Sequence, residues 1–192
     1  ISNKNKSIMI IADDIIFKKG WYQDLEASFN NGDIIGFSML KPNSNKVLDY
    51  GYDFILVNNT LSTEGRYKGQ NSDQLTVDSF RECDAVCGCC MIIKKEVINS
   101  GIKFQQNGYQ RWSELIFSYQ AKEKGFNTIV LSSYLYHHGI SSKKSKNKTL
   151  SSISWLIESE LWSEVVSEYF GVVRPIIKKE VALDDNLKQF IT

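Results

Sequence analysis

Two adjacent aspartates, Asp13 and Asp14, follow directly on the apolar run at residues 8–12. Neighbouring carboxylates repel each other, so ionising both is costly unless a cation lies beside them. Carboxylate oxygens are ligands that suit hard divalent ions such as Mg²⁺ or Mn²⁺. The pattern therefore indicates a metal site at the end of a strand. The alternative is that one aspartate caps the following turn while the other is solvated.

The two histidines of the chain, His137 and His138, end another extended segment and are followed by Gly139. Successive side chains of a strand point to opposite faces of its sheet. One histidine can therefore join the aspartates at a metal, and the other cannot. The alternative is that each is a hydrogen-bonded histidine at the surface or at a sheet edge.

A third candidate is Glu114, which follows Trp112 and Ser113 at the start of a predicted helix. A carboxylate at the mouth of a cleft, beside an aromatic side chain, can act as a general base. The alternative is purely structural, because a carboxylate in the first turn of a helix interacts favourably with the helix dipole.

All four cysteines fall within the stretch "CDAVCGCC", namely Cys83, Cys87, Cys89 and Cys90. A zinc ribbon or finger needs two separated pairs, which this spacing lacks. Cysteines this close together also cannot form a disulfide framework between distant segments. We interpret them as small apolar residues of a core strand, on which Cys87 and Cys89 share a face and Cys90 points the other way. A zinc site is the alternative.

Apolar runs and their spacing predict the elements that must position these residues. Strands are predicted at residues 8–12, 33–40, 84–93 and 126–131, and helices at residues 21–32, 94–101, 113–125 and 149–170. Gly32, Gly101 and Gly125 are predicted to end the first three helices. The first strand lacks polar alternation, which is typical of a parallel strand covered on both faces. The polar segment 58–80 is predicted to cross the surface as a long loop.

Strands and helices alternate along the chain, so the predicted class is α/β. Open α/β sheets bind ligands beyond the carboxyl ends of their strands, which is where Asp13 and Asp14 stand. The length of 192 residues fits one domain, and 42% hydrophobic residues suffice for a core. The net charge of +1 gives no reason to expect a nucleic-acid partner. No apolar run can span a bilayer and no signal peptide is recognisable, so we expect a cytoplasmic protein.

The order of these motifs resembles that of the family 2 inverting glycosyltransferases of the GT-A fold, especially bacterial polysaccharide and rhamnosyl-type members. The stretch "ADDIIFKKGW" is similar to the DxD-type motif and the "GW" helix that follows it in that family. The stretch "DAVCGCCMIIKKEV" is similar to the D-x-x-x-G strand on the acceptor side. The stretches "RWSELIFSYQAKEKGF" and "HHGIS" are similar to the segment that supplies the catalytic base and to the closing H-x-G-x-S. The resemblance covers residues 7–142.

This resemblance implies a fold and an activity. Residues 1–148 would form a GT-A-like mixed sheet flanked by helices, the C-terminal, acceptor-side portion of such a domain. Residues 149–192 would form a C-terminal helical extension. The enzyme would transfer a sugar from a nucleotide-sugar donor to a hydroxyl of a saccharide or lipid-linked acceptor, with inversion at the anomeric carbon. A lipid-linked acceptor, and the basic loop at residues 143–148, would suit peripheral association with the inner face of the membrane.

The resemblance also implies a role for each candidate residue. Asp14 and His137, with Asp13, would hold Mn²⁺ or Mg²⁺ against the donor diphosphate, and Asp13 could instead contact the donor ribose. Glu114 would be the catalytic base. The acceptor would be bound by side chains and backbone on the other side of the cleft, at Trp112, Asp84, Gly88 and His138.

The sequence departs from the family pattern in two places. Ser113 stands where the first acid of the family pair is usual, and Glu114 stands where aspartate is common. The chain also begins almost at the aspartate motif, so we expect the nucleotide-binding half in a missing N-terminal segment or a partner chain. Two other functions remain open. One is a non-catalytic saccharide-binding or degenerate transferase module, and the other is a metal-dependent phosphohydrolase that uses Asp13, Asp14 and a histidine.

Overall fold

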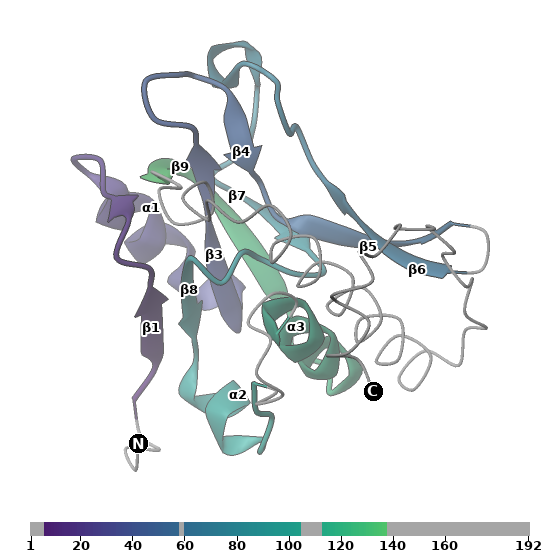
Figure 1. Ribbon diagram of the computed structural model, residues 1–192. Helices are drawn as coiled ribbons and strands as arrows, with labels where there is room; N and C mark the ends of the chain where they lie inside the picture. The colour runs from purple at the N-terminus through teal and green to yellow at the C-terminus, as the bar shows by residue number, and fades with distance from the viewer. Residues whose placement is uncertain (1–5, 58–59, 105–112, 138–192) are drawn as a thin grey trace, which may run out of the picture.

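A mixed sheet of seven strands forms the centre of the protein in the computed structural model, which describes residues 6–57, 60–104 and 113–137 (Figure 1). The strand order is β1-β8-β3-β9-β2, with β4 paired to β3 and β7 paired to β9. These strands are β1 Ile8–Ile11, β2 Ile15–Ile16, β3 Ile34–Leu40, β4 Val47–Asp49, β7 Phe80–Cys83, β8 Cys90–Ile93 and β9 Thr128–His137.

Strand direction decides which ends of the strands meet. β8 is antiparallel to both of its neighbours, β1 and β3, while β9 runs parallel to β3. β1, β3 and β9 therefore point the same way, and their carboxyl ends lie at one edge of the sheet. The residues that follow β1 and end β9 are the aspartates and His137, so the predicted placement of these motifs at strand ends is confirmed.

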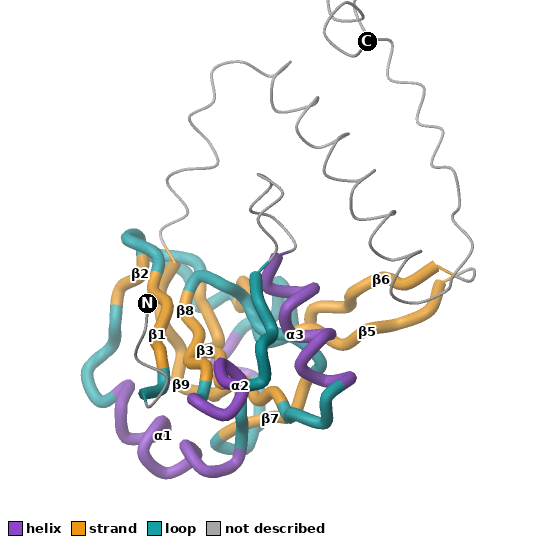
Figure 2. The backbone as a smooth tube through the Cα atoms, turned by 90° about the horizontal axis from the view of Figure 1, so that it is seen from below, coloured by secondary structure: helices purple, strands orange, loops and turns teal. Residues whose placement is uncertain are grey.

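Helices cover both faces of the sheet, as Figure 2 shows. Helix α1 Trp21–Ser28, continued by the 3₁₀ turn η1 Phe29–Asn31, lies on one face. Helices α2 Lys95–Asn99 and α3 Ser113–Glu123 lie on the other. The predicted α/β class is therefore confirmed as a mixed sheet flanked by a few helices.

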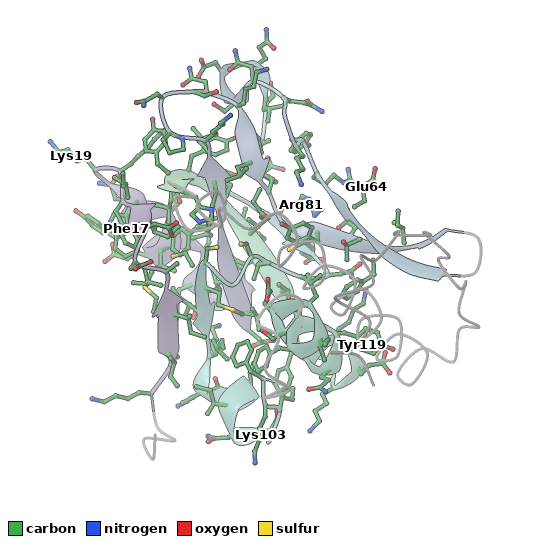
Figure 3. All side chains as sticks on the ribbon, in the orientation of Figure 1. Phe17, Lys19, Glu64, Arg81, Lys103 and Tyr119 are labelled. Carbon is green, nitrogen blue, oxygen red and sulfur yellow. The ribbon has the colours of Figure 1, made fainter. Side chains whose placement is uncertain are left out.

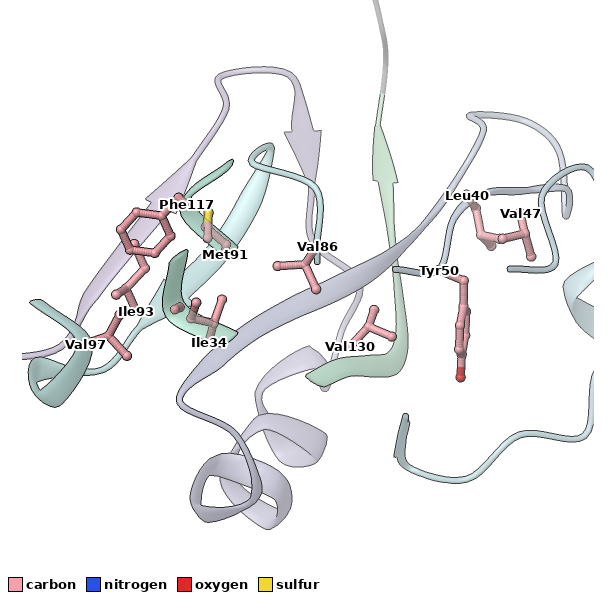
Figure 4. Close-up of a cluster of buried hydrophobic side chains, with 11 residues drawn as sticks. Ile34, Leu40, Val47, Tyr50, Val86, Met91, Ile93, Val97, Phe117 and Val130 are labelled. Atoms are coloured by element: carbon pink, nitrogen blue, oxygen red, sulfur yellow. The ribbon is translucent and has the colours of Figure 1, made fainter. Parts of the chain in front are cut away.

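Alternate side chains of β3 pack into the two hydrophobic cores, one on each face of the sheet. All seven of its residues are buried, and successive side chains enter opposite faces of the sheet. Ile34 and Leu40 join the cluster beneath α2 and α3, which contains Val97 and Phe117 (Figure 4). The other cluster is packed against α1 and contains Ile35, Phe37 and Met39 from β3 with Trp21, Leu25 and Phe29 from the helical segment.

A two-stranded hairpin, β5 Tyr52–Val57 and β6 Thr60–Gly65, projects from the sheet. Arg81 of β7, labelled in Figure 3, holds its base, because an Nη atom lies 2.7 Å from an Asp53 carboxylate oxygen of β5. The segment 58–80 was predicted to be a surface loop. That prediction is wrong in part, because the segment contains β6 and the 3₁₀ turn η2 Ser72–Gln74.

The glycines predicted to end the helices behave differently. Gly101 and Gly125 both adopt a φ of +83°, as expected of residues that close α2 and α3. Gly32 is extended, with a φ of −138°, so its predicted role as a left-handed cap is wrong. It is needed for another reason, because a Cβ at this position would lie 2.6 Å from Cγ1 of Ile129.

Two strand predictions also need correction. β1 pairs antiparallel with β8, is only partly buried, and has no partner on its other edge among the described residues; Ile11 is 47% exposed. It is therefore not a parallel strand covered on both faces. The predicted strand at 84–93 begins only at Cys90, because residues 84–89 turn between β7 and β8.

Three predictions lie outside the described residues. These are the helix at 149–170, the basic loop at 143–148 and the boundary at residue 148. Within the part that the structure describes, no helix is both long and apolar enough to cross a membrane.

Candidate metal and acid–base site

The pairing of β2 with β9 brings Asp14 and His137 together. Ile15 lies opposite His137 in this short ladder. As a result, Asp14 Oδ2 is 3.3 Å from His137 Nε2, and the two side chains are only 14% and 21% exposed. Asp13, the neighbouring carboxylate, is exposed. Of the two adjacent aspartates, Asp14 is therefore the one that the fold directs toward the histidine.

The segment that carries the aspartates is held at both ends. Before the pair, the Ala12 N–H donates to the Cys89 carbonyl at 2.7 Å. After it, the ring of Phe17 packs on that of Trp21 with centroids 4.5 Å apart, while Lys19 points away from the sheet (Figure 3). These contacts fix the path of the chain on either side of Asp14.

Cys89 lies between the Asp14–His137 pair and Glu114. Its Sγ lies 3.8 Å from His137 Nε2, and it is within electrostatic reach of both Asp14 and Glu114. Its side chain is also hydrogen-bonded to that of Cys87, and the hydrogen bond from Cys87 lowers the pKa of the Cys89 thiol. The prediction that the cysteines serve only as core residues therefore fits Cys90, which is fully buried in β8, better than Cys89.

Glu114 stands in the first turn of α3, facing the Gly88 backbone. A Cβ on Gly88 would lie 3.3 Å from the Cβ of Glu114, so the absence of a side chain lets the two segments approach closely. Burial raises the pKa of the Glu114 carboxyl, and the nearby charge of Asp49 raises it further. Hydrogen bonds from its own backbone N–H and from the Ser113 hydroxyl oppose this shift. A carboxyl with a raised pKa is a suitable proton acceptor near neutral pH.

The sequence interpretation missed Asp49 and Tyr52. Asp49, the last residue of β4, is 6% exposed, and its carboxylate accepts hydrogen bonds from the Gly51 N–H at 3.0 Å and from the Tyr52 hydroxyl. Burial raises the pKa of Asp49, and burial followed by the charge of Asp49 raises the pKa of Tyr52. A lone aspartate inside the apolar stretch "VLDYGY" was the available signal.

Asp84 is engaged by the protein itself. One carboxylate oxygen accepts from the Phe54 N–H at 2.7 Å, and the other forms an ion pair with Lys122 of α3. The side chain thus connects the hairpin to the helix. Its predicted contact with an acceptor stays a prediction, as does that of Gly88.

Not every predicted site residue is brought into this cluster. Trp112 and His138 lie outside the described residues. Among the residues that are described, no group of three or more His, Cys, Asp or Glu side chains could by itself hold a metal ion. Asp14 and His137 are therefore a pair of candidate ligands that would need further ligands from water or from a bound molecule.

Comparisons with known proteins assign no family. No protein-family model matches the sequence, and no curated protein is significantly similar to it. Among solved structures, the chain is similar to the one titled "Crystal Structure of A197 from STIV", with 16% identity and a TM-score of 0.40. The match covers 69% of this chain and 57% of that chain, so it spans just over half of the neighbour's length. A similarity this low carries no inference about function.

Proposed function

We propose that this chain carries the metal-binding and acceptor side of an inverting, GT-A-type glycosyltransferase that takes its sugar from a nucleotide donor. The observation that supports this most strongly is the approach of Asp14 to His137 at one edge of the sheet, with Glu114 of α3 facing the turn next to Cys89. Asp14 and His137 are 3.3 Å apart, and Cys89, next to the glycine that Glu114 faces, contacts His137. Two motifs that resemble the family and lie far apart in the sequence are in contact here, and the third faces the neighbouring turn.

The Asp14–His137 pair fits a divalent ion. Two ligands bound at about 2.1 Å and at right angles to each other lie about 3 Å apart, close to the separation of Asp14 Oδ2 and His137 Nε2. Mg²⁺-like ions commonly use only one or two protein ligands and complete their shell with water and substrate phosphates. A site with two ligands is therefore what a donor diphosphate would need, and a bound Mn²⁺ or Mg²⁺ would offset the charge developing on that leaving group.

In this proposal Glu114 accepts the proton of the acceptor hydroxyl. Its carboxyl faces the Gly88 backbone, and burial raises its pKa. As an acceptor hydroxyl attacks the anomeric carbon, the oxygen–carbon bond forms, the bond to the diphosphate breaks, and the hydroxyl proton passes to Glu114. A single displacement of this kind inverts the anomeric configuration. The acceptor would bind beside Gly88 and Glu114, and Asp84 would contact it from the rim.

The open edge of β1 is a second supporting feature. In a GT-A domain, the strand that precedes the aspartate motif is central, with neighbours on both sides. In the described part of this chain β1 is bonded only to β8. A further segment or partner chain carrying the nucleotide-binding strands could pair with this edge.

Calorimetric titration of the full chain with Mn²⁺, alone and with UDP, tests the proposal. We expect UDP to bind only when Mn²⁺ is present, Asp14→Ala to abolish that binding, and Glu114→Gln to retain it because Glu114 acts on the acceptor. Asp13→Ala is the matched control, and it should weaken binding less than Asp14→Ala because Asp13 is exposed.

The other functions predict different results, which assays of phosphate release and of oligosaccharide binding would show. A phosphohydrolase would release phosphate from simple phosphoesters without an acceptor sugar. A non-catalytic saccharide-binding module would bind oligosaccharide but neither Mn²⁺ nor UDP. Metal-independent UDP binding, or equal loss in Asp14→Ala and Glu114→Gln, would contradict the division of roles proposed here.

A further inference from the structure

We propose that two copies of this chain associate through β1, in an antiparallel ladder about a two-fold axis. The inference goes beyond the proposed transferase function and does not depend on it. Among the described residues β1 is paired only with β8, and Figure 1 shows it at the margin of the sheet. A strand with one uncovered side can pair with another extended segment. The features of β1 indicate which segment fits it.

The backbone of β1 shows which of its polar groups face outward. The Ala12 N–H donates to the Cys89 carbonyl at 2.7 Å, directly beyond the antiparallel ladder that β1 forms with β8. In such a ladder every second residue directs both its N–H and its C=O to the same neighbour. Ala12 and alternate residues before it therefore face β8. The N–H and C=O groups of Met9 and Ile11 face the other way, where no described strand meets them.

A second copy of β1 fits these outward groups. If the two strands run antiparallel with Ile10 at the two-fold axis, Met9 of each copy lies opposite Ile11 of the other. Each Met9–Ile11 pair can then exchange both of its N–H···O=C bonds. This register needs no residue outside β1, which spans Ile8–Ile11. The strand is therefore complementary to itself in its backbone.

The side chains agree with the same register on both faces of the sheet. Met9 packs against the core cluster on the α1 side, and Ile11, two residues later, points to that face as well. Ile11 is 47% exposed, and Met9 of the second copy would cover it. On the opposite face Ile10, which packs against the other core cluster, would lie against Ile10 of the second copy. Both hydrophobic cores would thus continue across the axis.

Charge complementarity favours a second copy as the occupant. No side chain of β1 is charged, so two such strands can face each other without repulsion. Lys6, which is exposed, precedes the strand, and Asp13, which is also exposed, follows it. Antiparallel pairing brings the lysine of each copy beside the acidic turn of the other. Parallel pairing would instead place lysine beside lysine and aspartate beside aspartate, which is unfavourable.

The size of the contact sets the strength that we expect. Four residues from each copy form a small interface, and small interfaces are typically weak. Monomers should therefore predominate in dilute solution and dimers in concentrated solution. A two-fold contact uses the same surface of both copies, so this contact is complete when two chains have joined.

Sedimentation equilibrium of the full chain over a range of concentrations tests the pairing, in metal-free buffer with a reductant that prevents disulfides. We expect a monomer–dimer equilibrium. Lys6→Glu should raise the dissociation constant about tenfold, because two attractive contacts per dimer become repulsive. Asp13→Lys should have the same effect for the same reason. The double variant Lys6→Glu/Asp13→Lys restores both contacts and should dimerise as the unmodified chain does.

Lys46→Glu is the matched control for these variants. It makes the same change of charge at an exposed residue in the loop between β3 and β4, which lies away from β1 in Figure 1. The dissociation constant of this variant should equal that of the unmodified chain. Circular dichroism of each variant establishes that it is folded.

Hydrogen exchange of individual amides provides a second measurement, which needs no variant. The N–H groups of Met9 and Ile11 should become protected as the protein concentration rises, because only the dimer supplies their acceptors. Those of Ile8 and Ile10 face β8 in the monomer, so their exchange should change far less. Protection that alternates along β1 in this way would identify the register.

Three results would overturn the proposal. The first is a chain that stays monomeric at every concentration reached, which would leave this side of β1 to a strand of another protein. The second is a double variant that dimerises no better than Lys6→Glu alone. The third is exchange at Met9 and Ile11 that does not depend on concentration while dimers form, because the contact would then lie elsewhere.

Discussion

Asp14 Oδ2 lies 3.3 Å from His137 Nε2, although the two residues come from opposite ends of the described chain. The contact depends on β2, a strand of two residues that pairs with the last two residues of β9. A very short ladder thus determines whether these side chains can act on one ligand.

We predict that Mn²⁺ stabilises the folded chain through this pair. A ligand at about 100 times its dissociation constant adds about 2.7 kcal/mol to the free energy of unfolding. Asp14→Asn and His137→Asn should each abolish the increase, and the double variant should lose no more than either single variant. Chemical unfolding of each protein with and without Mn²⁺ measures this increase in the free energy of unfolding. Additive losses would mean that the two residues act separately, and Asp13→Asn serves as the control.

We predict that Asp49 makes stability depend on pH. Burial raises its pKa, so the folded protein holds this proton more tightly than the unfolded chain, whose carboxyl has a pKa of about 3.9. The stabilising effect is complete below that value and is lost as the pH rises through the raised pKa. Asp49→Asn cannot ionise, so its free energy of unfolding relative to the unmodified chain should increase with pH. Urea unfolding at a series of pH values measures the free energy of unfolding of both proteins. Parallel curves of this free energy against pH for the unmodified chain and Asp49→Asn would contradict the prediction.

Asp49→Ala is the companion variant for that measurement. It leaves the Gly51 N–H and the Tyr52 hydroxyl without their acceptor, which costs about 1–3 kcal/mol for a buried group. Asparagine can still accept from the Gly51 N–H and donate to the tyrosine oxygen. Asp49→Ala should therefore be the less stable of the two variants at every pH.

We predict that Asp84 stabilises the fold more than its ion pair alone would suggest. Lys122 is 54% exposed, so Lys122→Ala should cost less than about 1 kcal/mol. Asp84→Ala also removes the acceptor of the Phe54 N–H and should cost about 1–3 kcal/mol. Asp84→Asn retains an acceptor for that N–H and should fall between them. If Asp84→Ala leaves the free energy of unfolding unchanged, the contacts of Asp84 with Phe54 and Lys122 do not stabilise the fold.

We predict that Gly32 is required because Ile129 occupies the space of a side chain. A Cβ at residue 32 would lie 2.6 Å from Ile129 Cγ1, so Gly32→Ala should cost about 1–3 kcal/mol. In Gly32→Ala/Ile129→Ala the obstructing atoms are gone. The double variant should therefore lose less free energy of unfolding than the two single variants lose together. Gly65→Ala is the control, because the nearest atom to its Cβ would be at an ordinary 3.6 Å. Strict additivity would contradict this explanation.

The sequence was sufficient to predict the helices, strands and turns that have a strong local pattern. The buried strand β3, the helix that begins at Trp21, and the glycines that close α2 and α3 were all predicted. Each depends on periodicity or on a backbone conformation that favours glycine. Such features are properties of a short stretch of chain and need no knowledge of its neighbours.

Features that depend on distant partners were not predictable. β1 reads as a buried strand, yet its burial depends on which strands lie beside it, and the described residues supply only β8. The sequence predicts Gly32 as a helix cap. Glycine is needed there because the side chain of Ile129, in a different strand, occupies the space of a Cβ. Asp49 was missed because a single polar residue in an apolar stretch carries no motif, and only the fold brings it near Glu114.

The side of β1 that no described strand covers has a consequence for handling the protein. An uncovered strand presents a row of free N–H and C=O groups that another extended chain can recognise. Here that row runs along Ile8, Met9, Ile10 and Ile11, a stretch with no charged side chain and no proline to deter such pairing. Unless this side is occupied, the chain should self-associate as its concentration rises, and a lysine at exposed Ile11 should delay that aggregation.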